Sequence, residues 1–153
     1  MRALTKIVGA SLAFATTSSV AVTTDPFAFR LELTPEEGPL DPAVEARKSL
    51  EWGTCVQGAR TTRQSGTCQA EEFLRRNAEL NHVWHVTLRG PSAANRRAFI
   101  AAQRKWVAAR DPFCRKEADR YKGGTISPVI YGSCRVELTI RRTLWLESLK
   151  WPA

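Results

Sequence analysis

The sequence predicts an all-α fold, a small disulfide-stapled bundle of three to four helices. Apolar residues recur at helical intervals, four cysteines are spread over residues 55–134, and no segment alternates convincingly at period two. With 153 residues, 43% of them hydrophobic, the chain can bury the core of one ordinary domain. We expect three units, namely a signal peptide at residues 1–21, a flexible leader at 22–40 and a helical domain at 41–153.

Residues 1–21 have the pattern of an export signal. Arg2 and Lys6 supply positive charge, residues 7–15 are mostly apolar, and residues 19–21 offer small side chains for cleavage. The apolar run is too short to span a bilayer, so no transmembrane segment is expected in the mature protein. No cysteine precedes Cys55, so the acylation site of a lipoprotein is missing. We expect an exported protein, periplasmic or secreted and not a lipoprotein; the alternative is an ordinary N-terminal strand.

The leader and the first helix are predicted from proline and glycine. Residues 22–40 contain three prolines and no sustained periodicity, which is typical of an extended or partly disordered segment. Asp41 and Pro42 suit the N-cap and first residue of a short helix, which should run to about Trp52 before Gly53 stops it. A polar loop, flanked by Gly58 and Gly66, should then separate the first two cysteines.

Three longer segments show helical periodicity. The first starts near Cys68 and ends at Gly90-Pro91, with Phe73, Leu80, Trp84 and Leu88 near one face. The second should begin at the cap Ser92, be kinked or broken by Pro112 near Asp111, and end at Gly123-Gly124; its stripe is Phe99, Ala102, Trp106, Arg110, Cys114 and Tyr121. The third should open at Ser127-Pro128 by the same cap logic, with Ile130, Cys134, Leu138, Trp145 and Leu149 on one side.

Four cysteines in an exported chain favour two disulfides. Three connectivities exist. Pairing neighbours, Cys55 with Cys68 and Cys114 with Cys134, closes two short loops, each restricting the unfolded chain by about 3 kcal/mol. A zinc site is the alternative, but no two cysteines have the close C-x₂₋₄-C spacing that structural zinc prefers.

Charge is distributed unevenly along the chain. The formal net charge is +8, and removal of Arg2 and Lys6 with the signal leaves 21 basic against 15 acidic residues. Residues 22–51 carry −4 and residues 52–153 carry +10. Such a basic body attracts anionic polymers. For an exported protein, cell-wall or outer-surface polyanions are the expected class and nucleic acid is not; the alternative is a surface that only keeps the protein soluble.

Catalysis and cofactor binding have little support in the sequence. His82 and His85 are three residues apart and close enough to share a metal ion, but they have no HExxH context. We interpret them as exposed, unliganded histidines. No GxSxG motif or glycine-rich phosphate loop occurs, and no paired carboxylates stand out from the scattered acids. We therefore predict no enzyme, no catalytic residue, no metal site and no cofactor.

Several polar and aromatic residues have a structural and a functional interpretation. Arg110, Asp111 and Arg142 suit a charge network near Cys114, and the alternative is an exposed Arg110 that binds an anionic partner. Asn81 is expected to hydrogen-bond a neighbouring loop rather than a ligand. The tryptophans on the helix faces are assigned to the core in preference to a sugar-stacking platform, and the two outside the stripes are candidate partner contacts if exposed; the sets are Trp84, Trp106 and Trp145, and Trp52 and Trp151.

Residues 52–149 resemble the LprI-type lysozyme-inhibitor domain. The most specific element is the string AQ-x-x-W-x-x-x-RD-x-x-C, followed after a glycine turn by C-x-x-x-LT-x-x-R. The residues that carry the resemblance are Cys55, Cys68, Leu80, Asn81, Trp84, Ala102, Gln103, Trp106, Arg110, Asp111, Cys114, Gly123, Gly124, Cys134, Leu138, Thr139 and Arg142. The resemblance implies a helical, disulfide-bonded, exported bacterial protein without enzymatic activity, and for some relatives it implies binding and blocking of lysozyme.

Two functions are therefore expected as alternatives. The first is a secreted inhibitor that occludes the glycan cleft of lysozyme or another cell-wall hydrolase. Because a lysozyme target would also be basic, the net field opposes association and local acids would have to make the contacts. The candidates are Glu71, Glu72, Glu79, Glu117 and Asp119. The second function is a basic envelope protein that binds cell-wall or outer-surface polyanions.

Overall fold

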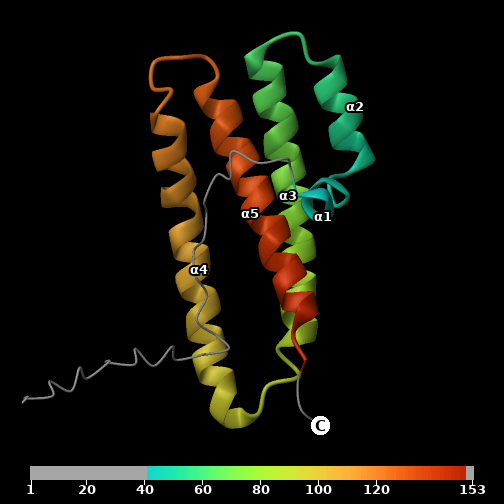
Figure 1. Ribbon diagram of the computed structural model, residues 1–153, viewed down its shortest axis with the longest axis vertical. Helices are drawn as coiled ribbons and strands as arrows, with labels where there is room; N and C mark the ends of the chain where they lie inside the picture. Colours follow the sequence, from blue (N-terminus) through green and yellow to red (C-terminus); the bar gives the residue numbers. More distant parts are fainter. Residues whose placement is uncertain (1–40, 151–153) are drawn as a thin grey trace, which may run out of the picture.

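The protein is an all-α bundle, as the sequence predicts. A computed structural model describes residues 41–150, which form five helices and no strand (Figure 1). They are α1 (Pro42–Glu45), α2 (Leu50–Gly58), α3 (Thr62–Thr87), α4 (Ala93–Asp119) and α5 (Ser127–Ser148). The predicted signal peptide, the leader and Trp151 lie outside the described residues. Within residues 41–150, no helix combines the length and apolarity needed to cross a membrane.

The three long helices lie side by side with α5 in the middle (Figure 1). α5 packs against both α3 and α4, and α2 packs on the outer side of α3. Among the described residues, no Cα atom of α3 comes within 8 Å of a Cα atom of α4. The helices therefore follow the spatial order α4, α5, α3, α2, which puts α4 and α2 at opposite edges of the molecule.

The N-terminal part of the domain differs from the prediction. The expected helix from Asp41 to Trp52 is divided into α1 and α2, because Ser49 caps a new helix by accepting a hydrogen bond from Trp52 N at 3.0 Å. Gly53 does not stop this helix but lies inside it. Gly66 likewise lies inside α3, so the predicted polar loop shrinks to residues 59–61.

Capping explains where α3 and α4 begin. Thr61 and Gln64 form a reciprocal capping box at the start of α3, which outweighs the low helix propensity of Gly66. Ser92 caps α4, as predicted, by accepting a hydrogen bond from Asn95 N at 3.4 Å. α4 then runs through Pro112 without ending, so the predicted break is wrong. The loss of one backbone donor is offset by the burial of side chains on both sides of the proline.

The turn between α4 and α5 requires glycine. Gly123 has φ +86, the left-handed region that side chains disfavour, and α4 ends just before it at Asp119. Tyr121, predicted on the helical stripe, lies in this turn and is exposed. Pro128 is in the first turn of α5 as predicted, but Ser127 is not its cap, because its hydroxyl donates to the Ala118 carbonyl at 3.1 Å.

Both disulfides have the favoured neighbour pairing. Cys55–Cys68 joins α2 to α3, and Cys114–Cys134 joins α4 to α5. The bonds close segments of 13 and 20 residues. Each disulfide therefore links two helices that are neighbours both in sequence and in space.

The core has two clusters along the bundle. The larger cluster is formed by α3, α4 and α5, and its buried members are Leu80, Phe99, Trp106, Cys114, Leu138 and Leu146. The smaller cluster ties α1 onto α3 and α5 through Val44, Phe73, Val136 and Ile140. Trp106 is fully buried, whereas Trp84 and Trp145 pack at the edge of the larger cluster, with ring centroids 4.7 and 6.3 Å from that of Phe99. All three tryptophans thus pack in or against the core, as expected.

Candidate functional site

Arg110 lies inside the bundle in a charge network. Its side chain is 7% exposed, and its Nε lies 2.8 Å from Asp111 Oδ1. A second nitrogen donates to Asn77 at 3.1 Å and to Thr139 at 3.4 Å, and Arg135 also pairs with Asp111 at 3.3 Å. The structure therefore gives Arg110 a structural role, and the alternative of an exposed, partner-binding Arg110 is wrong.

Arginines and aromatic rings alternate through the bundle on either side of this network. Each guanidinium carbon lies 3.5–5.6 Å from the centroids of the rings beside it. The order is Tyr131, Arg135, Phe73, Arg110, Trp106, Arg142 and Trp145. The sequence interpretation missed Arg135 and Tyr131. Four members of the set lie on one face of α5 at intervals of four, seven and three residues, namely Tyr131, Arg135, Arg142 and Trp145. This spacing is the sequence pattern from which the stack could have been predicted.

Arg142 is the most deeply buried cation of this set. Its residue is 1% exposed, and its Nε donates to Gln103 Oε1 at 2.8 Å. Burial lowers the pKa of the Arg142 guanidinium from its ordinary value to about 9. The side chain therefore stays charged at neutral pH. Because an arginine offers only donors, it also fixes the orientation of the Gln103 amide.

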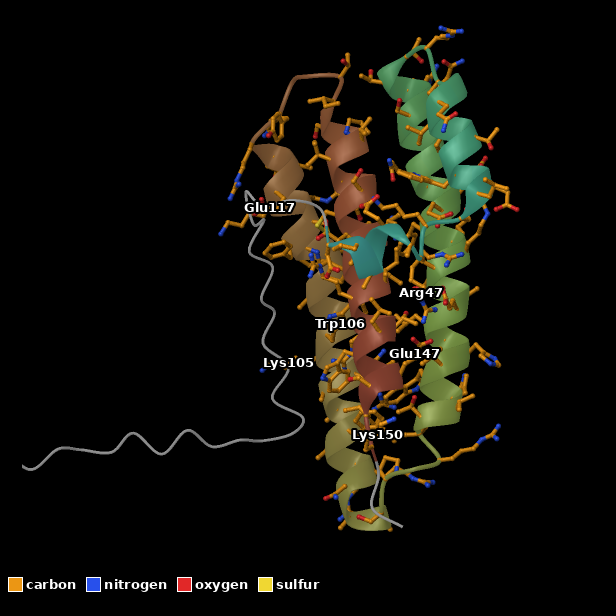
Figure 2. All side chains as sticks on the ribbon, turned by 45° about the vertical axis from the view of Figure 1, so that its right-hand side comes forward. Arg47, Lys105, Trp106, Glu117, Glu147 and Lys150 are labelled. Atoms are coloured by element: carbon orange, nitrogen blue, oxygen red, sulfur yellow. A yellow bond between two sulfur atoms is a disulfide. The ribbon has the colours of Figure 1, made fainter. Side chains whose placement is uncertain are left out.

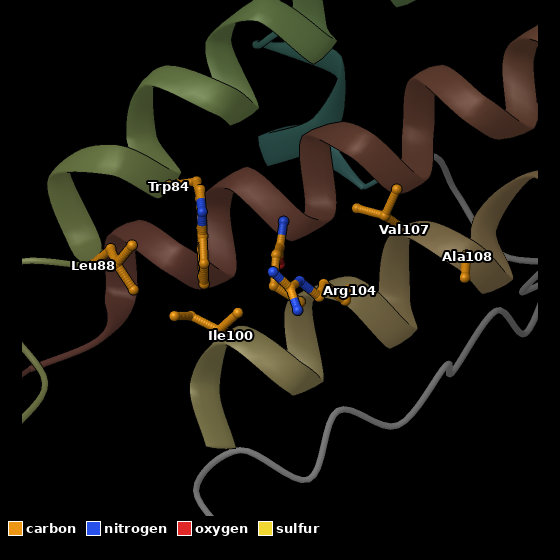
Figure 3. Close-up of a pocket in the computed structure, with 7 residues that line it drawn as sticks. Trp84, Leu88, Ile100, Arg104, Val107 and Ala108 are labelled. Atoms are coloured by element: carbon orange, nitrogen blue, oxygen red, sulfur yellow. The ribbon is translucent and has the colours of Figure 1, made fainter. Parts of the chain in front are cut away.

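A groove runs beside Gln103, between the C-terminal end of α3 and the middle of α4. Its cavity volume is about 480 Å³. Its lining is mostly apolar and consists of Trp84, Leu88, Ile100, Gln103, Arg104, Val107 and Ala108. Figure 3 shows Trp84, Leu88 and Ile100 at one end, Arg104 in the middle, and Val107 and Ala108 at the other end. We call this feature the α3–α4 groove.

The surface of α4 near the groove and of the loop before α4 is strongly basic. Residues 80–110 contain six cationic residues and no acidic residue. Five of them are exposed and form no ion pair with any residue of the described part of the chain; they are Arg89, Arg96, Arg97, Arg104 and Lys105. Lys105 points away from the bundle in Figure 2. We call these five residues the basic face.

Glu72 was expected to contact a partner, but it is fully buried. Its carboxylate accepts hydrogen bonds from the backbone and the hydroxyl of Ser49 and pairs with Arg75 and Arg76 at 3.2 Å. The carboxylate thus fixes the residue that caps α2. The expectation is therefore wrong for Glu72, because a buried group with four partners has no surface to offer.

The other four acidic candidates lie at two separate places. Glu71 and Glu79 are on α3, whereas Glu117 and Asp119 are at the C-terminal end of α4. Glu71 is half exposed, and its nearest cation, Arg75, is 3.7 Å away. Glu117 is largely covered and pairs with Arg120 at 3.0 Å. The structure therefore does not gather these acids into one patch.

Arg47 links the segment between α1 and α2 to two long helices. It pairs with Glu79 of α3 and with Glu147 of α5, and Figure 2 shows Arg47 facing Glu147. The hydrogen bond to Glu147 is the largest influence that raises the pKa of Arg47. Glu79 is shared further with Arg76 at 2.8 Å. Glu79 is thus engaged within the protein and less available to a partner than Glu71.

Two large apolar side chains are exposed on α2 and α3. Leu50 is 84% exposed and follows Ser49, the residue that Glu72 binds. Leu74 is 66% exposed and lies on α3 three residues after Glu71. We call Leu50, Glu71 and Leu74 the α2–α3 edge. The sequence interpretation missed both leucines, because their spacing alone does not distinguish them from core residues.

The remaining candidates are placed as follows. Asn81, His82 and His85 are exposed on α3, so Asn81 does not pack within the helical stripe. Trp52 is partly buried and donates to Gln69 at 3.1 Å. Within residues 41–150, no group of three or more His, Cys, Asp or Glu side chains is arranged to hold a metal ion.

Comparison with known proteins identifies relatives of the region that carries these features. The model of the family described as "Lysozyme inhibitor LprI" matches residues 55–146. An uncharacterized protein of Rhizobium meliloti is 26% identical over 95 residues, which cover 54% of this chain and 68% of that protein. No solved structure matches the chain. The family match contains the α3–α4 groove, both disulfides and the whole basic face.

Proposed function

Because this chain belongs to the LprI lysozyme inhibitor family, we propose that it is an exported, non-enzymatic protein that binds lysozyme and occludes its glycan cleft. The family match is the observation that carries this proposal. Export is supported by the signal-like residues 1–21 and by two disulfides, which persist in oxidising compartments. Steric occlusion requires no catalytic group on the inhibitor.

We propose the α2–α3 edge as the surface that contacts lysozyme. A basic lysozyme is repelled by the basic face on α4. The α2–α3 edge lies on the opposite side of the row of helices from α4 (Figure 1). Residues 41–79, which include this edge, carry six acidic and six basic residues and are therefore neutral. The exposed leucines offer apolar contact area, and Glu71 offers a carboxylate to a cationic partner.

Lysis of bacterial cell walls by lysozyme tests the proposed function directly. The oxidised protein is titrated into the assay at low and at near-physiological salt. We expect saturable inhibition at a near-stoichiometric ratio. If lysis is unchanged at a large molar excess at both salt concentrations, the proposal fails.

Charge reversals at two edges test the proposed surface. Glu71→Lys should weaken inhibition about tenfold or more, because a close interfacial charge pair becomes repulsive. Asp119→Lys makes the same change of charge at the edge that carries α4. It should change inhibition less than about twofold, because only the weak, screened effect of net charge remains there. Equal losses from both variants would assign the effect to net charge and refute the α2–α3 edge.

The basic face favours a second candidate function, binding of cell-wall or outer-surface polyanions. Five exposed cations without acidic neighbours in sequence form a surface to which an anionic polymer can bind. Such binding should weaken steeply between about 50 and 200 mM salt, because the Debye length falls from roughly 14 to roughly 7 Å over that range. Binding to a teichoic-acid-type polymer that is insensitive to salt would contradict this candidate.

A further inference from the structure

The α3–α4 groove combines an apolar surface with room for a small molecule. Trp84, Leu88 and Ile100 form one end, and Val107, which is 45% exposed, lies at the other end. The cavity volume of about 480 Å³ falls within the range of roughly 300–1,000 Å³ that is typical of small-molecule sites. A ligand with an apolar body would remove this surface from water.

Gln103 adds a hydrogen-bond donor to this apolar groove. The residue is 7% exposed and lines the groove. Its Oε1 accepts the hydrogen bond from Arg142 Nε at 2.8 Å. Because arginine has no acceptor, the amide cannot be reversed, so any hydrogen bond from the Gln103 side chain to a ligand is donated by Nε2. A ligand that fits here needs an acceptor atom beside its apolar body.

Arg104 adds a positive charge at the middle of the groove. It is exposed, and it forms no ion pair with a described residue. The whole segment from residue 80 to residue 110 lacks acidic residues, so neighbouring cations raise the local potential further. The polar end of a matching ligand is therefore an anion.

We infer that the α3–α4 groove binds a single-chain fatty-acid-type ligand, with its acyl chain against Trp84, Leu88 and Ile100 and its carboxylate at Arg104 and Gln103. A neutral lipid would leave the cation and the amide donor unused. A sugar would bury hydroxyl groups against apolar walls that offer no partners. The inference is independent of lysozyme binding, because it concerns the groove beside α4 and not the α2–α3 edge.

Titration calorimetry with saturated fatty acids tests the site on the oxidised protein. The probes are octanoate, decanoate and dodecanoate below their micelle concentrations, with acetate as the control for the head group. Burial of a methylene group strengthens binding by at most about fourfold, from about 0.8 kcal/mol per CH₂. We expect at least a roughly twofold gain per methylene in this partly open groove and no measurable binding of acetate. Absence of dodecanoate binding would overturn the inference.

Two neighbouring charge reversals separate a local contact from general attraction. Arg104→Glu and Lys105→Glu change the net charge equally, but Lys105 lies about 100° further around α4 and does not line the groove. We expect Arg104→Glu to weaken dodecanoate binding at least tenfold and Lys105→Glu at most about twofold, since only Arg104 meets the carboxylate. Equal losses would overturn the site, and circular dichroism checks that both variants are folded.

A substitution in the apolar wall and a membrane control complete the test. Ile100→Asp should abolish dodecanoate binding, because it places a second carboxylate beside the acyl chain. Vesicles of phosphatidylglycerol also combine acyl chains with anionic head groups, but they present them as a membrane surface instead of as single molecules. If the protein binds such vesicles but Arg104→Glu and Lys105→Glu have equal effects on both probes, α4 recognises anionic membranes and the groove is not a ligand site.

Discussion

Gly132 of α5 lies in close contact with Gln69 of α3, and its replacement by alanine should destabilise the protein. A Cβ atom built on Gly132 would lie 2.5 Å from Gln69 Cβ, 3.4 Å from its Cγ and 3.7 Å from its Cα. Contacts under 3.0 Å are essentially absent for real Cβ atoms, and the atom that is met here belongs to the root of the Gln69 side chain. The clash can therefore be relieved only if the two helices move apart.

The expected magnitude follows from two opposing terms. Alanine in place of glycine inside a helix gains about 1 kcal/mol of helix propensity. Overpacking of a close helix contact costs about 1–3 kcal/mol. Gln69 also accepts the indole hydrogen bond of Trp52 at 3.1 Å and follows the disulfide residue Cys68, so its displacement disturbs the α2 contact as well. The two terms leave a net loss of about 0–2 kcal/mol, and the disturbed α2 contact puts the expected loss in the upper half of that range, at about 1–2 kcal/mol.

Denaturant unfolding of the oxidised protein, followed by tryptophan fluorescence, measures this loss. Gly53→Ala is the matched control, because Gly53 also lies inside a helix and a Cβ atom there meets nothing within 4 Å. The control should be more stable than the original protein by up to about 1 kcal/mol. Gly132→Ala should lower Tm by roughly 5–10 °C. If Gly132→Ala equals or exceeds the original protein in stability, the close approach of α3 and α5 is refuted.

Three further predictions concern buried charge and the second disulfide. Glu72→Gln should lower the free energy of unfolding by about 2–4 kcal/mol, because it weakens a fully buried set of charged hydrogen bonds. The surface control Glu71→Gln should lower it by less than about 0.5 kcal/mol. Similar unfolding midpoints for the two variants would contradict this prediction. Arg142 keeps its proton in both states below pH 9, and above it the folded state releases the proton first, because its pKa is lowered to about 9. The free energy of unfolding of the original protein minus that of Arg142→Met should thus be constant from pH 6 to 8 and rise above pH 9 by up to about 1.4 kcal/mol per pH unit. A fall above pH 9 would refute the lowered pKa of Arg142. Replacing Cys114 and Cys134 by serine should lower the free energy of unfolding by about 3 kcal/mol, measured against the oxidised protein, and an unchanged value would show that the 20-residue link does not restrict the unfolded chain.

Features set by neighbouring residues could be predicted from the sequence. The apolar stripe of α3, the cap at Ser92 and the glycine turn at Gly123 depend on contacts within a few residues of the chain. The pairing of Cys114 with Cys134 was favoured because neighbouring cysteines close short loops, and the structure confirms it. The resemblance to the LprI family rests on the same kind of information, since it is carried by residues in a fixed order.

Predictions failed where distant segments decide the outcome. Pro112 and Gly53 disfavour a helix locally, yet α4 and α2 continue through them, because packing on neighbouring helices and the cap at Ser49 offset about 1–3 kcal/mol of propensity. From the sequence, Glu72 is predicted to be an exposed acid. In the structure it is buried where Ser49, the cap of α2, meets α3. Its sequence neighbours do not reveal that burial.

The sequence by itself determined the helical class, the family and the basic character of residues 80–110, and it favoured the disulfide pairs that the structure contains. Only the tertiary structure decided which side chains meet. It placed Arg110 inside the bundle, brought Trp84 of α3 and Arg104 of α4 into the lining of one groove, and put Gly132 at a close helix contact where a Cβ atom would meet Gln69. The physical reason is that helix formation depends on residues three or four positions apart, whereas burial, grooves and close contacts depend on how whole helices pack.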